Sequence, residues 1–98
     1  MPRNAIFSRR AQRWVDAQLD YLDERNPVAA ERLLQRLDAA VRQLIDFPNS
    51  GFRGKILGTR QLVITPYILT YRQASADLIV ILDIRHGRQR EMPLAEEP

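Results

Sequence analysis

The chain has 98 residues, enough for one domain with a single core and too few for two. It has no cysteine and one histidine, His86, which excludes disulfides, a cysteine nucleophile and zinc sites built from thiolates or several histidines. Its net charge is +3, with 45% hydrophobic and 28% charged residues, which excludes a disordered chain. No apolar run reaches the roughly 18 residues of a membrane span, so we expect a cytoplasmic protein without membrane association or a cofactor.

The N-terminal half predicts a strand followed by a helix. Asn4–Phe7 is a short candidate strand, and Ser8 is suited to cap a helix that runs to about Glu24. Apolar side chains recur there at helical spacing: Ala11, Trp14, Val15, Leu19 and Leu22. We expect Trp14 to lie in the core or at the border of a groove between helices.

A second helix is predicted from Asn26 onward. Asn26 fits the N-cap and Pro27 the first helical position, where a missing N–H costs nothing. The helix should end at Phe47–Pro48, and one stripe is apolar: Ala30, Leu33, Leu34, Leu37, Val41, Leu44 and Ile45. Because the connection is so short, the two helices should form an antiparallel hairpin.

The C-terminal half predicts a sheet. A glycine-containing loop over residues 48–58 precedes three β-rich runs at residues 60–65, 67–73 and 78–85, which are separated by gaps short enough for hairpins. The expected fold is α+β, with an N-terminal strand and the helical hairpin packed on one face of a three- to four-stranded antiparallel sheet. We expect one domain over residues 1–98, with residues 89–98 loosely ordered.

Register assigns side chains to the two sheet faces. A four-residue turn at residues 74–77 would place Gln73 opposite Leu78. The face toward the helices would then carry Tyr67, Leu69, Tyr71, Leu78, Val80 and Leu82. The open face would carry Ile68, Thr70, Arg72, Ile79, Ile81, Asp83 and Arg85. A one-residue slip would reverse these assignments.

The charge is unevenly distributed. Residues 49–90 contain seven basic and two acidic side chains, whereas the last eight residues contain three glutamates and no base. The basic segment is suited to nucleic acid or an acidic partner, or is simply a solvated surface. Asp83 is expected to pair with an arginine of the sheet. His86 is either a structural residue at the core margin or a general acid.

Taken together, these motifs resemble the ParE branch of the RelE/ParE toxins of bacterial toxin–antitoxin pairs. The matching segments are Asn26–Pro27 with Ala29–Ala30, Leu44 to Pro48, Gly51, Gly58-x-Arg60-x-Leu62, Pro66 to Arg72, and Ile81–Leu82 through His86 to Gln89. The resemblance covers roughly residues 5–90.

The resemblance implies a toxin that inhibits DNA gyrase by binding. A cognate antitoxin would neutralise it with an acidic, amphipathic C-terminal segment, in a hetero-oligomer built through the antitoxin. We expect the target to contact Arg72, Arg85 and Arg88. The expected antitoxin contacts are Trp14, Leu22, Arg72, Ile79 and Ile81.

Two alternatives remain. RelE-like relatives cut mRNA on the ribosome, and Arg60, Arg72 and His86 occupy positions where their catalytic groups appear. This chain, however, has Gly87–Arg88 where those relatives carry a tyrosine. The other alternative is an inactive or repurposed module that only binds another protein.

Overall fold

The structure is a computed structural model that describes Pro2 and residues 4–88, so the tail at residues 89–98 lies outside the described residues. The elements, in chain order, are β1 (Asn4–Phe7), α1 (Arg9–Arg25), α2 (Pro27–Asp46), β2 (Phe52–Arg53), β3 (Arg60–Ile64), β4 (Tyr67–Ser75) and β5 (Leu78–His86). Within the described residues, neither helix combines the length and the apolarity needed to cross a bilayer.

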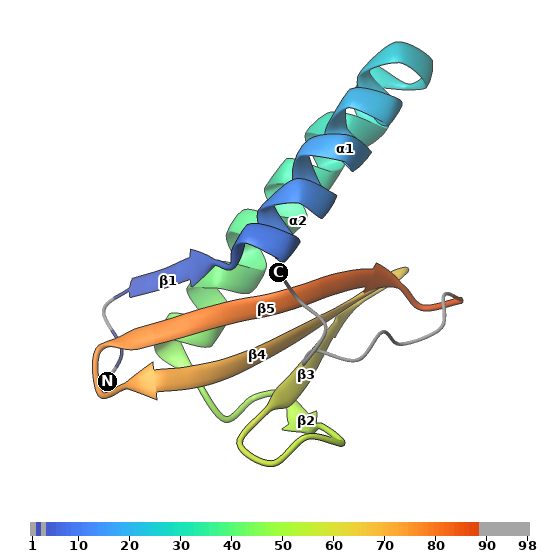
Figure 1. Ribbon diagram of the computed structural model, residues 1–98. Coiled ribbons are helices and arrows are strands. Elements are labelled where there is room, and N and C mark those ends of the chain that lie inside the picture. Colours follow the sequence, from blue (N-terminus) through green and yellow to red (C-terminus); the bar gives the residue numbers. More distant parts are fainter. Residues whose placement is uncertain (1, 3, 89–98) are drawn as a thin grey trace.

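The strands form one sheet in the order β1-β5-β4-β3-β2 (Figure 1). The predicted α+β fold is confirmed, with a larger sheet than expected. The N-terminal strand joins the edge and runs parallel to β5, whereas the other pairs are antiparallel. The two-residue strand β2, expected to be loop, pairs with Gln61 and Arg60 of β3 and adds the fifth strand.

The predicted helix starts are confirmed by their capping contacts. The Ser8 hydroxyl accepts a hydrogen bond from the Ala11 amide at 3.1 Å and donates one to the Leu82 carbonyl at 2.8 Å. It therefore ties the start of α1 to β5 as well as capping the helix. At the second start, the Asn26 side chain accepts from the Ala29 amide at 3.2 Å, and Pro27 is the first helical residue.

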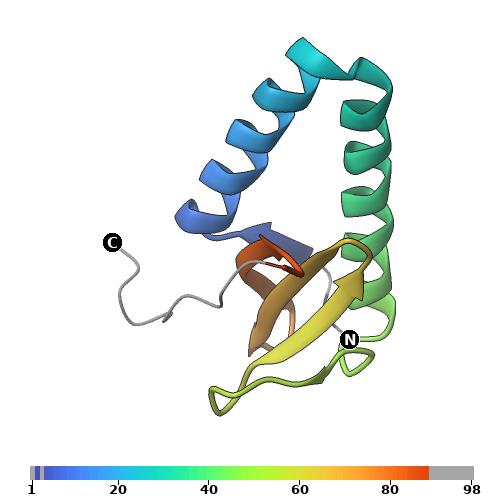
Figure 2. The ribbon, with the colours of Figure 1, turned by 90° about the vertical axis from the view of Figure 1, so that its right-hand side faces the viewer.

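Both helices lie on one side of the sheet, and their shared tip extends beyond it (Figures 1 and 2). The core lies between the sheet and the helix halves nearest to it. The largest fully buried side chains are Leu44, Leu69, Tyr71, Ile79, Ile81 and Ile84. Trp14, Leu19 and Leu22 pack against this core while staying partly exposed.

The predicted side-chain faces of β5 are partly wrong. Gln73 pairs with Ile79 rather than Leu78, because the connection after β4 spans two residues and not four. The first half of β5 is thus shifted by one residue, and Ile79 and Ile81, expected on the open face, are 0% exposed in the core. A register shift between Thr70 and Tyr71 leaves Leu82 without a partner in β4 and places Ile84 in the core.

Candidate functional site

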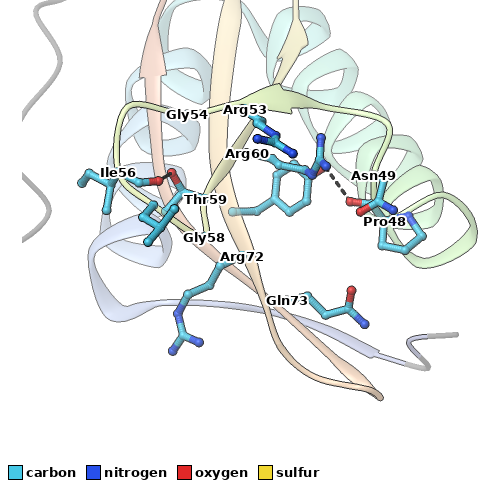
Figure 3. A pocket seen from close by; sticks show the side chains of 12 residues that line it. Pro48, Asn49, Arg53, Gly54, Ile56, Gly58, Thr59, Arg60, Arg72 and Gln73 are labelled. Carbon is cyan, nitrogen blue, oxygen red and sulfur yellow. Dashed lines mark hydrogen bonds between the residues drawn. The ribbon is translucent and has the colours of Figure 1, made fainter.

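A hollow of about 380 Å³ lies at the end of the sheet where the chain from Pro48 to Thr59 folds against β3 and β4 (Figure 3). Three arginines from three different strands line it: Arg53 of β2, Arg60 of β3 and Arg72 of β4. The rest of the lining is Pro48, Asn49, Gly54, Ile56, Leu57, Gly58, Thr59, Tyr71 and Gln73. We call this feature the arginine hollow.

A buried tyrosine holds one wall of the arginine hollow. The Tyr71 hydroxyl donates a hydrogen bond to the Pro48 carbonyl at 2.8 Å and accepts one from the Gly51 amide at 3.0 Å. Gly51 fits because a Cβ there would lie 2.5 Å from the Gln61 carbonyl oxygen. The Arg60 guanidinium donates to the Gly51 carbonyl at 2.8 Å.

The opposite wall is a tight turn centred on Thr59. The Gly54 amide donates to the Thr59 carbonyl at 2.9 Å, and the Thr59 hydroxyl donates to the Ile56 carbonyl at 2.6 Å. A Cβ on Gly54 would lie 2.4 Å from that hydroxyl. These contacts fix the course of the loop between β2 and β3 and hence the direction from which Arg53 enters the hollow.

The electrostatics of the hollow follow from its lining. The twelve lining residues include three arginines and no aspartate or glutamate. None of the three guanidinium groups has a carboxylate partner among the ion pairs of the described residues. Because ion pairing does not neutralise them, the hollow is a positively charged site with free capacity for an anion.

His86 lies at the other end of the sheet. Its ring contacts the Tyr67 ring edge-on at a centroid distance of 5.9 Å, and Tyr67 in turn contacts Trp14 at 5.2 Å. The Arg88 amide donates to Nδ1 of His86 at 3.2 Å. His86 is half-buried, so its surroundings match the core-margin histidine of the sequence analysis.

The three candidate ribonuclease residues are not brought together. Arg60 pairs with Tyr71, and His86 pairs with Tyr67, which lies four residues earlier in β4. At the rise of a strand this separation is about 13 Å. Arg72 follows Tyr71 on the same strand and therefore points to the opposite sheet face from Arg60.

Asp83 forms its ion pair with a helix residue. The Nε atom of Arg10, on α1, lies 3.1 Å from a carboxylate oxygen of Asp83, and the two side chains are 18% and 9% exposed. This partner lies in the helical hairpin, whereas the sequence predicted an arginine of the sheet. The contact helps to anchor the start of α1 to β5.

A second hollow, of about 320 Å³, lies between the helices beside β1. Its lining is mostly apolar: Phe7, Gln12, Val15, Leu34, Leu37, Asp38 and Val41. We call it the hairpin groove. Leu34, predicted as part of the apolar stripe, is 51% exposed there.

The expected antitoxin contacts have different positions. Trp14 and Leu22 are partly exposed on α1, and Arg72 is exposed on β4. The expectation that Ile79 and Ile81 offer surface to a partner is wrong, because both are fully buried beneath the helices. Among the expected target contacts, Arg72 and Arg88 are exposed and Arg85 is half-buried.

The sequence indicated a groove between the helices beside Trp14, but not the lining of the hairpin groove, which does not include Trp14. Sequence reasoning missed that Arg53 lines the same hollow as Arg60 and Arg72. The groove needs the angle between two helices, which no local pattern encodes. The arginines line one hollow because β2 pairs with β3 and β3 with β4. The excess of basic residues after residue 48 was the available signal.

Comparison with known proteins identifies the class to which this fold and surface belong. Residues 5–91 match the family model of the ParE toxin of the type II toxin–antitoxin system parDE. The solved chromosomal ParDE toxin–antitoxin system from P. aeruginosa has a similar fold, with a TM-score of 0.71 and 25% identity over 86% of this chain and 95% of that one. The chain is therefore a type II toxin, and it belongs to the ParE toxin family.

Two curated relatives agree with this assignment. A protein named toxin Y4kP, from Sinorhizobium fredii, is 40% identical over 93 residues, which cover 92% of this chain and 95% of the relative. Toxin RelE2 of Caulobacter vibrioides is 31% identical over 82 residues, covering 84% and 92%. Similarity thus extends over nearly the whole length of both relatives.

Proposed function

We propose that this ParE-family toxin acts in the cytoplasm by binding DNA gyrase and that a cognate antitoxin keeps it inactive. The family match supports a toxin that is paired with an antitoxin, and gyrase is the target that the resemblance of the sequence implies. The observation that carries the choice of binding over catalysis is the separation of Arg60 and His86 along β4.

That separation matters because RNA cleavage needs its groups at one phosphodiester. A general acid must lie within hydrogen-bond reach of the leaving oxygen, about 3 Å, while a cation stabilises the same phosphorane. About 13 Å of strand separates the residues facing Arg60 and His86, and the Arg60 guanidinium is bonded to the Gly51 carbonyl, so the structure does not hold the two groups at one phosphodiester. A binding toxin has no such requirement.

The hairpin groove is the antitoxin surface in this proposal. It combines an apolar floor with the exposed Leu34 side chain, which is the arrangement that accepts the apolar face of a helix. The positive charge of the sheet half favours an acidic partner. The antitoxin segment would lie over the groove and reach Trp14 and Leu22, and the antitoxin's own dimerisation would give a hetero-oligomer.

The target surface in this proposal is the open face of the sheet. Arg72 is exposed at one end of that face, and Arg85 and Arg88 lie toward the other. Both helices are on the far side, so the antitoxin groove and these arginines are separate surfaces (Figure 2). Binding to gyrase through this face leaves the hairpin groove free.

The test is expression of the toxin with and without its antitoxin, which is to be sought as a short reading frame beside the toxin gene that encodes a ribbon-helix-helix pattern. Toxin alone should stop growth, induce DNA-damage signalling and cause filamentation, and co-expression should restore growth. Growth arrest without DNA damage would contradict gyrase as the target. Harmless expression of the wild-type chain would instead support an inactive interaction module.

One observation favours a ribosome-dependent ribonuclease as the second candidate: Arg60 and Arg72 line the same hollow. Primer extension on ribosome-bound mRNA tests it. A ribonuclease using His86 as its acid should lose about 10²–10⁴-fold in rate in His86→Phe. Phenylalanine keeps the ring contact with Tyr67, so this variant separates chemistry from folding.

A further inference from the structure

We infer that the arginine hollow binds the phosphate backbone of duplex DNA. The inference rests on the proposed function in one respect: it identifies the DNA held by gyrase as a second partner of the toxin. Its basis is that Arg53, Arg60 and Arg72 line one hollow whose lining contains no acidic side chain.

Arginine is the side chain best suited to this ligand. Its planar guanidinium presents several N–H donors and pairs with phosphate in a bidentate manner. The Gly51 carbonyl occupies one terminal nitrogen of Arg60, and within the described residues no carboxylate forms an ion pair with Arg53 or Arg72. An incoming anion thus replaces water rather than an existing ion pair.

The arrangement fits a row of phosphates better than a single one. Arg60 and its partner in β2, Arg53, lie on one face of the sheet, whereas the Arg72 side chain extends from β4 away from both (Figure 3). Guanidinium groups that point in different directions cannot all chelate one small anion, whereas they can contact successive phosphates of a backbone that runs along this end of the sheet.

The rest of the lining favours duplex DNA over a single strand or a peptide. Tyr71 is the only aromatic residue of this lining and it is 1% exposed, so the hollow offers no platform on which unpaired bases could stack. Leu57, on the same loop, is fully exposed beside the arginines. An exposed apolar side chain next to arginines is a combination that proteins use at the DNA minor groove.

The experiment measures the anisotropy of a fluorescein-labelled 20-base-pair duplex titrated with the full-length toxin, without gyrase, between about 50 and 200 mM salt. Three phosphate contacts predict a slope of log K against log salt of about −2.7, which is about a 40-fold loss of affinity over this range. The variant Arg53→Gln/Arg72→Gln should reduce the slope to about −0.9 and the loss to about 3.5-fold.

The matched control is Arg13→Gln/Arg32→Gln, which removes the same charge from exposed positions on the helices. It should bind DNA with the slope of the wild type. Equal slopes for all three proteins, or no binding at 50 mM salt, would overturn the inference. So would stronger hollow-dependent binding of a single-stranded RNA or of a poly-glutamate peptide.

Two further comparisons distinguish a DNA backbone from free phosphate, and the DNA-binding proposal from the gyrase proposal. Inorganic phosphate at constant ionic strength should not displace the duplex, and displacement would show a site for free phosphate instead. Because gyrase is absent, failure of DNA binding is distinct from failure of the gyrase proposal. If gyrase is not inhibited while the hollow still binds the duplex, only the proposed target is wrong.

Discussion

The hydroxyl of Tyr71 and the amide of Gly51, twenty residues apart, form a buried hydrogen bond of 3.0 Å. The same hydroxyl donates to the Pro48 carbonyl, so one side chain of β4 holds the chain that leaves α2. This contact joins the core to the arginine hollow, because Tyr71 belongs to both. The position of the loop that carries Arg53 therefore depends on a residue buried under the helices.

Removing that hydroxyl should cost stability. In Tyr71→Phe the Gly51 amide and the Pro48 carbonyl lose their partner, and unsatisfied buried polar groups cost about 1–3 kcal/mol. Urea unfolding followed by circular dichroism measures the change. Tyr21→Phe, at an exposed position on α1, is the control and should unfold like the wild type. Equal stability of Tyr71→Phe and Tyr21→Phe would show that the two hydrogen bonds of the Tyr71 hydroxyl contribute nothing to the stability of the fold.

Two glycines of the same loop should respond differently to alanine. In Gly51→Ala the added Cβ meets backbone at 2.5 Å and the Tyr71 ring at 2.9 Å, which predicts a loss of about 3 kcal/mol. In Gly58→Ala the Cβ meets nothing within 4 Å, and only the backbone φ of +84° opposes it, at about 1 kcal/mol. Thermal unfolding measures the loss of stability in each variant. A larger loss in Gly58→Ala than in Gly51→Ala would contradict the packing described here.

The ion pair between Arg10 and Asp83 should contribute more to stability than the exposed ion pair between Asp38 and Arg42. Asp83→Asn leaves a shielded guanidinium without its carboxylate, for an expected loss of about 3 kcal/mol. Asp38→Asn removes an exposed pair with Arg42 at 3.8 Å and should change stability by less than about 0.5 kcal/mol. Denaturant midpoints at one pH compare them. Similar midpoints would mean that the Arg10 contact does not anchor α1.

The hairpin groove can be tested without disturbing the core. Leu34→Glu places a charge in the groove at a side chain that is already half exposed, so the fold should keep its stability while antitoxin affinity falls about tenfold or more. Val28→Glu, at a similarly exposed position outside the groove, is the matched control. Calorimetric titration with the antitoxin measures both. Equal affinities would place the antitoxin elsewhere.

The parts of the fold that depend on neighbouring residues could be predicted from the sequence. Ser8 and Asn26 cap helices through bonds to amides three residues away, and Pro27 acts at its own position. The order of the three long strands likewise follows from short connections. These features need no information about distant parts of the chain.

The side-chain faces of β5 could not be predicted in the same way. They depend on a two-residue turn and on a register shift opposite Thr70 and Tyr71, which are decided by packing across the sheet. A shift of one residue moved Ile79 and Ile81 from the surface to the core and removed them from the antitoxin contacts. Beyond the register shift, Ile84 lies in the core at 2% exposure.

The candidate site was foreseen as separate residues and not as a surface. Arg72 was expected to contact a partner, and Arg60 was named only as a candidate ribonuclease residue, whereas its guanidinium bonds the Gly51 carbonyl. Arg53 lies beside them only because Phe52–Arg53 forms the short strand β2. A strand of two residues has no recognisable sequence pattern. Tertiary pairing of this kind creates the arginine hollow.

The most direct test of the account incubates supercoiled plasmid with purified DNA gyrase, ATP and either wild-type toxin or His86→Phe, and then counts linear plasmid after detergent denaturation. A toxin that acts by binding should trap gyrase-dependent double-strand breaks to the same extent in both forms. No linear plasmid with the wild type, together with cleavage of ribosome-bound mRNA that His86→Phe abolishes, would contradict the account.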